Sequence, residues 1–264
     1  GTAKAQESTS QSIVTNVQEQ DVKKPVSYPK LKLGGLFQAR YLASFKKDVD
    51  INGLQHTDGK SINNSFDIKR MRVSLNAKIS ENLELNGLVN LADFKNDPKT
   101  RVLENAFAKY TVNQYLKIQA GQFRPAFGIE DSFPVDIVKS IDWSNAYYLM
   151  GSNGWQSFQI GVSAEGMVGL GDIPFNYSFA VTNGNGKNVT DNDNGKHYSG
   201  RFSFKFNEAN NFQVGLSSGI GEEQKESVYA VGVDLTYKFN LAPKWSLDFQ
   251  IEGSQATNHV LYFS

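Results

Sequence analysis

The sequence predicts an all-β protein that crosses a membrane as an antiparallel β-barrel. From Leu31 onward, apolar and polar residues alternate with a period of two, and no comparable stretch has helical spacing. The alternating segments are joined by connections that are short at one end and longer at the other. A helical span is excluded, because no run of about 18 apolar residues occurs.

Composition narrows the class of protein before any motif is considered. The 264 residues include 27 Lys+Arg, 27 Asp+Glu and no Cys, and 39% are hydrophobic. A net charge of zero argues against a nucleic-acid-coating protein, and the lack of cysteine excludes disulfides and thiolate metal sites. With Phe 18 and Tyr 11, the composition favours strands. A soluble all-β protein and a transmembrane barrel with a polar lumen both remain.

Eleven segments alternate clearly enough to be strands. In the first, Phe37 and Tyr41 share one face while Gln38 and Arg40 share the other. The first five segments lie in 31–45, 70–79, 83–91, 105–112 and 116–120. The next six lie in 157–165, 175–181, 198–206, 212–217, 229–239 and 245–252.

The lengths of the connections favour the membrane barrel over a soluble sandwich. We expect long connections at 46–65, 125–155 and 183–197, and medium ones at 95–100 and 221–227. Short connections are expected at 80–82, 113–114, 166–172, 207–210 and 240–244. Outer-membrane barrels have tight periplasmic turns and long extracellular loops. Aromatic residues beside the short turns fit an interfacial girdle; they are Phe206, Phe212, Tyr237, Phe239 and Trp245.

If the apolar face meets lipid, the polar face lines a lumen whose charges become informative. The face assignment gives ten inward cations and five inward acids, and hence a net positive lumen that would favour anions. The candidate anion pathway is Arg40, Arg70, Arg72, Lys109, Lys117, Arg201 and Lys205. The alternative is that these charges pair across strands and only solvate the wall.

The connection at 125–155 has an unusual composition. It is long and carries apolar residues that need burial, among them Phe127, Trp143 and Tyr147. In a barrel such a loop can only fold inward, where it would narrow the pore. Its candidate charged residues are Arg124, Glu130, Asp131, Asp136, Lys139 and Asp142.

The stretch ENAFAKYTVNQYLKIQAGQFRPAFGIED, from Glu104 to Asp131, resembles the phosphate-selective porin O and P family, whose mark is a strand entering G-Q-F-[KR]-x-x-F-G-[IL]-E. The aromatic-rich strands are similar to those of Bacteroidetes members. The resemblance implies a bacterial outer-membrane porin, homotrimeric, with roughly sixteen strands, an even number as is usual for such barrels. It also implies passage of phosphate-like anions. A single loop lysine, Lys139, among four acids argues against strict phosphate selectivity.

The remaining expectations concern organisation and chemistry. We expect residues 1–30 to be the remnant of an export signal and a disordered lead-in, and 31–264 to be the barrel. Eleven is an odd number of strands, so we expect part of a longer porin; a twelve-stranded barrel with an irregular last strand is the alternative. No metal site, cofactor, nucleic-acid partner or enzymatic activity is expected. The expected partners are lipid and small anions. The alternative functions are a docking subunit of an outer-membrane assembly and, more remotely, a membrane-embedded hydrolase.

Overall fold

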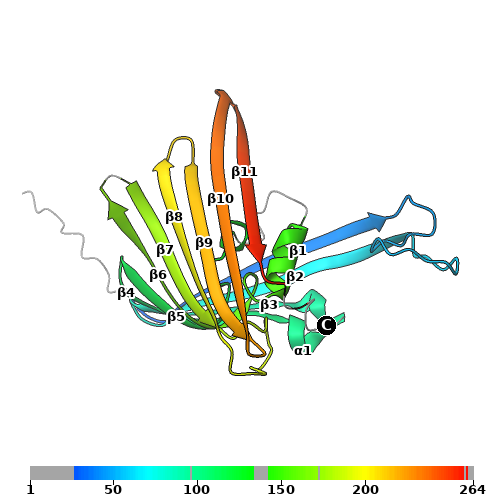
Figure 1. Ribbon diagram of the computed structural model, residues 1–264, viewed down its shortest axis with the longest axis horizontal. Coiled ribbons are helices and arrows are strands. Elements are labelled where there is room, and N and C mark those ends of the chain that lie inside the picture. The colour runs from blue at the N-terminus through cyan, green and yellow to red at the C-terminus, as the bar shows by residue number, and fades with distance from the viewer. Residues whose placement is uncertain (1–26, 96, 134–141, 172, 259, 261–264) are drawn as a thin grey trace, which may run out of the picture.

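The computed structural model describes residues 27–95, 97–133, 142–171, 173–258 and 260. They form one eleven-stranded antiparallel sheet in which the strands are ordered as in the sequence. Figure 1 shows a strongly curved sheet, and the described strands leave it open between β1 and β11. The first six strands are β1 (Lys30–Ala43), β2 (Asn64–Lys78), β3 (Leu83–Asn90), β4 (Leu103–Asn113), β5 (Leu116–Phe123) and β6 (Gln159–Leu170). The others are β7 (Ile173–Thr182), β8 (His197–Asn207), β9 (Phe212–Glu223), β10 (Glu226–Ala242) and β11 (Trp245–Ala256).

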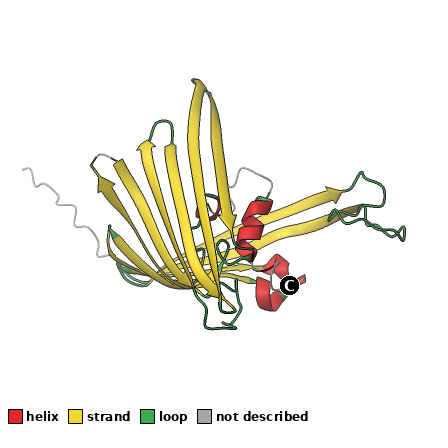
Figure 2. Ribbon diagram, viewed as in Figure 1, coloured by secondary structure: helices red, strands yellow, loops and turns green. Residues whose placement is uncertain are grey.

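Four short helices of the described residues lie in the connections between strands (Figure 2). They are η1 (Leu91–Lys95), α1 (Pro98–Arg101), η2 (Glu130–Ser132) and α2 (Asn145–Ser152). Helix α2 begins at a polar cap, where the Ser144 hydroxyl accepts a hydrogen bond from the Tyr147 amide. None of the helices in the described residues is long and apolar enough to cross a membrane.

The expected all-β antiparallel fold is confirmed, and two connections are shorter than expected. Between β9 and β10 the turn consists of Gln224 and Lys225, both with positive φ, instead of a medium connection at 221–227. The two strands pair as far as Glu223 and Glu226. The sequence does not predict this extension, because these strand ends contain only glycine and polar residues and so show no alternation in hydropathy. Strand β6 likewise continues to Leu170, so the connection expected at 166–172 is mostly strand.

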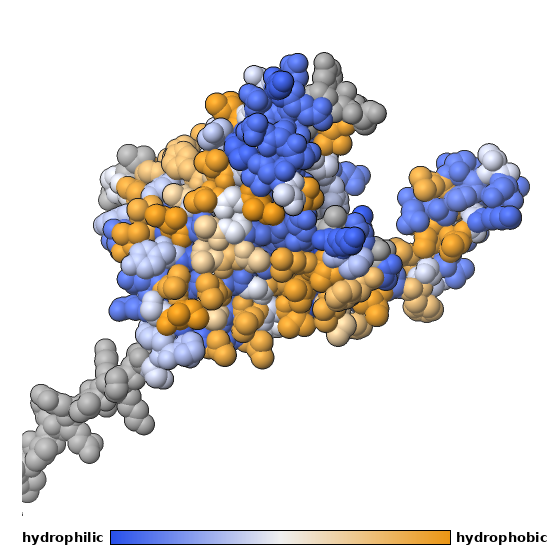
Figure 3. Space-filling model, turned by 90° about the horizontal axis from the view of Figure 1, so that it is seen from below, coloured by the Kyte–Doolittle hydropathy of each residue, from blue (hydrophilic) through white to orange (hydrophobic). Residues whose placement is uncertain are grey.

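The two faces of the sheet have the polarity of a membrane barrel. Apolar side chains are exposed on the outer face, for example Leu33 at 75% and Ile251 at 56% exposure. Figure 3 shows such hydrophobic side chains spread over the outer surface. The inner face buries polar groups instead, including Arg70, Arg201 and Asp234. A soluble sandwich would have the opposite distribution.

Aromatic rings form a continuous row at the short-turn ends of β7–β10. Phe206 contacts Phe212 with ring centroids 5.3 Å apart, and Phe212 contacts Tyr237 at 5.9 Å. Tyr237 then contacts Phe239 at 4.5 Å. This row matches the expected aromatic girdle, because aromatic rings favour the boundary between lipid and water.

Two β-bulges change which side chains face inward. In the β1–β2 ladder, Gln38 pairs with Arg70 and Ala39 with Ile68, so Lys69 is an extra residue. In the β3–β4 ladder, Leu88 pairs with Asn105 and Val89 with Leu103, so Glu104 is extra. A bulge redirects side chains relative to strict alternation. Both residues lie next to the interior charges described below.

Candidate functional site

The 124–158 connection between β5 and β6 packs on the inner face of the sheet. Near its beginning, the Gly128 amide donates to the Ser217 hydroxyl of β9 at 3.0 Å. The Ile129 and Glu130 amides donate to the Glu252 carboxylate of β11 at 2.8 and 3.3 Å. The Gln156 side chain donates to the same carboxylate at 3.1 Å. The described parts of the connection therefore lie inside the curve of the sheet, as expected for an inward-folded loop.

Aromatic side chains of the loop are buried against small residues of the inner face. Trp155 and Phe127 are each 1% exposed, and their ring centroids are 6.2 Å apart. A Cβ atom added to Gly219 of β9 would lie 2.3 Å from Trp155, so the indole occupies the space that this glycine leaves. Trp155 also stacks on the buried His197 ring at 4.3 Å. This packing buries the large apolar side chains of the loop and removes them from water.

A second set of contacts joins the loop to β2. The Asp142 carboxylate accepts from Lys69 Nζ at 2.5 Å and from Arg70 Nη2 at 2.8 Å. It also accepts from the Tyr148 hydroxyl at 2.9 Å. Burial alone would raise the pKa of Asp142, but the hydrogen bonds from Lys69, Arg70 and Tyr148 outweigh it and hold this pKa well below its usual range. Asp142 is therefore an ionised counter-charge to two adjacent cations.

Other inner-face arginines are held by carboxylates of the wall. Arg72 Nε lies 2.7 Å from Glu104 Oε2, and both residues are buried. Arg201 meets Asp234 in a bidentate pair, with Nη–Oδ distances of 2.5 and 3.0 Å. Such pairs neutralise charge locally and stiffen the wall.

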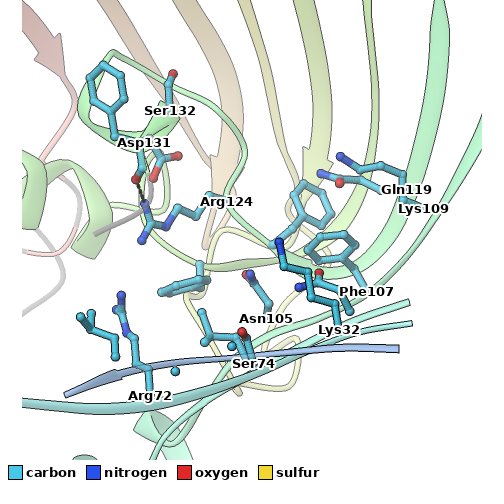
Figure 4. Close-up of a pocket in the computed structure, with 18 of the residues that line it drawn as sticks. Lys32, Arg72, Ser74, Asn105, Phe107, Lys109, Gln119, Arg124, Asp131 and Ser132 are labelled. Carbon is cyan, nitrogen blue, oxygen red and sulfur yellow. Dashed lines mark hydrogen bonds between the residues drawn. The ribbon is translucent and has the colours of Figure 1, made fainter. Parts of the chain in front are cut away.

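Three cavities lie along the inner face. The loop-end cavity, about 490 Å³, adjoins the longer connections. Its charged lining residues come from β1, β2, β4, η1, α1 and the 124–158 and 183–196 connections. The first turn-end cavity, about 790 Å³, is shown in Figure 4, where Lys32, Arg72, Lys109 and Arg124 surround it. The second turn-end cavity, about 670 Å³, is lined by Lys117, Arg201 and Glu165 among others. Arg72, Arg124 and Phe158 line both of the first two cavities.

Cations outnumber carboxylates most strongly in the loop-end cavity. Its eight cationic lining residues are Arg40, Lys69, Arg70, Arg72, Lys95, Arg101, Arg124 and Lys187. Its three acidic ones are Asp67, Asp93 and Glu104. Asp67 accepts from both Arg40 and Lys95, so part of this positive charge is neutralised within the wall.

Arg124 separates the loop-end cavity from the first turn-end cavity. Its Nη1 donates to the Phe133 carbonyl at 2.7 Å. Its guanidinium carbon lies 4.9 Å from the Phe158 ring centroid and 5.0 Å from that of Trp143. Aromatic faces and a carbonyl thus orient the cation between two cavities.

The loop also contains a buried acid, Asp131, which lies near Arg124 (Figure 4). Asp131 is 4% exposed and accepts from the Tyr147 hydroxyl at 3.2 Å and the Ser157 amide at 3.1 Å. Burial raises the pKa of Asp131 to about 7, although Arg124 acts in the opposite direction. Glu130, in contrast, accepts from the Ser144 hydroxyl and amide, which fixes the start of α2.

The structure brings most of the predicted pathway residues to these cavities. Arg40, Arg70 and Arg72 line the loop-end cavity, Lys109 the first turn-end cavity, and Lys117 and Arg201 the second. Lys205 lines none of the three and pairs with Glu208 at the β8–β9 turn. Of the predicted loop residues, Asp136 and Lys139 lie outside the described residues.

Sequence reasoning missed several charges at the site. The inward count omitted Asp67, Glu104 and Asp142, so it missed the carboxylate partners of Arg40, Arg72 and Arg70. It also missed four cations of the loop-end cavity: Lys69, Lys95, Arg101 and Lys187. Glu104 and Lys69 are bulge residues, and Asp67 lies in the part of β2 that precedes the segment expected at 70–79. The others lie in connections, where a period of two gives no orientation.

Comparison with protein-family models matches residues 43–228 to phosphate-selective porin O and P. The match covers more than half of the chain. The chain belongs to this family. A comparison with curated proteins finds no match. The chain is therefore an outer-membrane porin by family, and this is a family of channels rather than of enzymes.

The GQFRPAFGIE motif of this porin has a physical explanation at several positions. Gly121 has φ +127°, and an added Cβ would lie 2.2 Å from the Ala106 carbonyl oxygen. Gln122 donates to the Leu103 and Glu104 carbonyls at 2.9 and 2.8 Å, and so fixes the bulge in β4. Gly128 has φ +75°, and an added Cβ would lie 2.2 Å from Glu252 Oε1. The motif therefore bends the chain from β5 into the interior.

Proposed function

We propose that this porin lets small anions, phosphate among them, diffuse passively across the outer membrane. The observation that carries the proposal is the loop-end cavity, whose lining has eight cations and three carboxylates. Fixed positive charge around confined water raises the local concentration of anions and repels cations. The arrangement favours transport over tight binding, because many of these cations already have a carboxylate partner.

Arg124 and the cations near it provide the most direct path between the cavities. An anion leaving the loop-end cavity would pass Arg124, which also lines the first turn-end cavity, and then reach Lys32 and Lys109. Lys109 contacts Glu165 at 2.6 Å, so its charge is only partly available there. Guanidinium groups suit phosphate oxygens, because their planar donors match the geometry of an oxyanion. A homotrimeric assembly, which the family resemblance implies, is part of the same proposal.

Reversal potentials in a KCl gradient test the proposal. The protein expressed from its whole gene is reconstituted in a planar lipid bilayer, and we expect anion preference. Arg101, an exposed residue of the loop-end cavity, is replaced in Arg101→Glu; this should move the reversal potential towards cation preference. The shift should shrink with salt, because the Debye length falls from about 10 Å at 0.1 M to about 3 Å at 1 M.

Lys60→Glu is the matched control for Arg101→Glu. It makes the same change of charge in the β1–β2 connection and does not line the loop-end cavity. It should leave the reversal potential close to that of the wild type. Cation preference in the wild type, or equal shifts in the two variants, would contradict an anion pathway. A protein that inserts without conducting would favour a docking subunit.

A further inference from the structure

Two carboxylate clamps hold the 124–158 loop to β11 and β2, and they differ in chemistry. Glu252 of β11 accepts from the Ile129 and Glu130 amides and from the Gln156 side chain. At the other clamp, the loop itself supplies the carboxylate, Asp142, and β2 supplies Lys69 and Arg70. The first clamp uses backbone and amide donors, whereas the second uses side-chain cations.

The donors at the second clamp are those that an oxyanion would use. An ammonium, a guanidinium and a phenol converge on Asp142 within 2.9 Å, and the Trp143 amide adds a fourth donor at 3.0 Å. Lys69, Arg70 and Tyr148 also line the loop-end cavity, which has a volume of about 490 Å³. The same donors therefore contact both the loop carboxylate and the space through which solute would pass.

Arg70 is positioned independently of Asp142. Its Nη1 donates to Gln38 Oε1 of β1 at 2.7 Å, while Nη2 donates to Asp142. The bulge at Lys69 places two consecutive cations beside the same carboxylate, although strict alternation would separate them. These features keep the donors together if the carboxylate leaves.

We propose that Lys69, Arg70 and Tyr148 form a binding site for one small oxyanion of the phosphate class, and that Asp142 fills this site when solute is absent. The inference rests on the proposed function, since it assigns a solute site within the same pathway. The carboxylate of Asp142 is a tethered competitor, and binding exchanges one set of charge-assisted hydrogen bonds for another. No covalent bond changes.

A tethered competitor has a direct consequence for transport. The apparent affinity of a site equals its intrinsic affinity multiplied by the fraction of time for which the site is vacant, so a competitor that occupies the site lowers the apparent affinity. Weak apparent affinity allows fast release, which conduction requires. The low pKa of Asp142 keeps the competitor charged at neutral pH. Asp142 therefore weakens binding of an anion that the cations alone would hold.

Inhibition of the chloride current by inorganic phosphate tests the inference. Currents are recorded in planar bilayers with the protein expressed from its whole gene, and the phosphate concentration for half-block is measured. Asp142→Asn removes the competing charge, so the half-block concentration should fall by at least about tenfold. Asp142→Glu retains the charge and should remain close to the wild type. In the background of Arg70→Gln, which removes the main donor, Asp142→Asn should no longer tighten the block.

Asp58→Asn is the matched acid-to-amide control, because Asp58 lies in the β1–β2 connection and does not line the loop-end cavity. It should not change the half-block concentration. An unchanged or weaker block in Asp142→Asn would overturn the inference, as would tightening that persists with Arg70→Gln. If the wild type is anion-selective in a KCl gradient and Asp142→Asn has no effect, only the site assignment fails. If the wild type prefers cations, the proposed function fails first.

Discussion

At the scale of single residues, protonation of Asp131 is linked to the stability of the loop. The pKa of Asp131 is about 7 in the folded chain, whereas the ordinary value is 3.8, because the carboxyl is buried against Tyr147 and Ser157. Folding therefore takes up a proton between these two pH values. The contribution of the neutral Asp131 carboxyl to the stability of the folded state is fully present below pH 3.8. It is lost as the pH rises through about 7, where the folded chain releases this proton.

We expect the backbone amides of 142–158 to exchange hydrogen faster at pH 8 than at pH 6, after correction for the intrinsic exchange rate. Ionisation of a buried carboxyl weakens the packing around it, which raises local opening. Asp131→Asn cannot ionise and should show equal protection at both pH values. A pH dependence that survives in Asp131→Asn would contradict the assignment to Asp131.

At the scale of elements, the bulge in β4 couples two strands through a buried ion pair. Glu104 faces inward only because it is the extra residue of the β3–β4 ladder, and there it meets Arg72 of β2. Gln122 of β5 holds the bulge by donating to two consecutive carbonyls, those of Leu103 and Glu104. Contacts between β2, β4 and β5 therefore depend on this one bulge.

Glu104→Gln should destabilise the porin by about 3–5 kcal/mol, because it leaves the buried Arg72 guanidinium without a counter-charge. The measurement is the free energy of unfolding by urea in lipid vesicles. Glu84→Gln is the control, since Glu84 is an exposed acid opposite Lys78 and Lys109 in the ladders of β3. It should change the free energy of unfolding by less than about 1 kcal/mol. Equal effects of the two substitutions would show that Glu104 is not a buried partner.

The bulges in β2 and β4 also limit how well the sequence predicts which side chains face inward. Alternation locates all eleven strands, because burial of one face imposes a period of two. It assigns Arg70 and Arg72 correctly to the inner face. It fails at Lys69 and Glu104, because an inserted residue reverses the alternation without any change in hydropathy. The contacts of Glu252 with the loop could not be predicted either, since they join distant segments through backbone amides.

At the scale of the whole molecule, the long connections lie at one end of the sheet and the turns after the even-numbered strands lie at the other end. The longer connections, 44–63, 91–102, 124–158 and 183–196, follow the odd-numbered strands β1, β3, β5 and β7. The turns after the even-numbered strands are short, and the turn after β9 is short as well. In outer-membrane barrels the long connections face the outside.

Cysteine labelling in intact cells tests this orientation, because the chain has no native cysteine. Asn185→Cys lies in the 183–196 connection and should react with a bulky impermeant maleimide from outside. Glu208→Cys lies in the β8–β9 turn and should react only after the outer membrane has been permeabilised. Equal labelling of the two variants before permeabilisation would contradict a transmembrane arrangement.

The Glu252 clamp has a consequence for the order in which the porin assembles. Glu252 lies 123 residues after Ile129, whose amide it binds, so the first part of the loop cannot reach its final position until β11 is in place. Contacts between such distant segments form late, because closing a long stretch of chain is entropically unfavourable. A half-assembled sheet would therefore have an unfilled interior, and narrowing of the passage would be among the last steps of biogenesis.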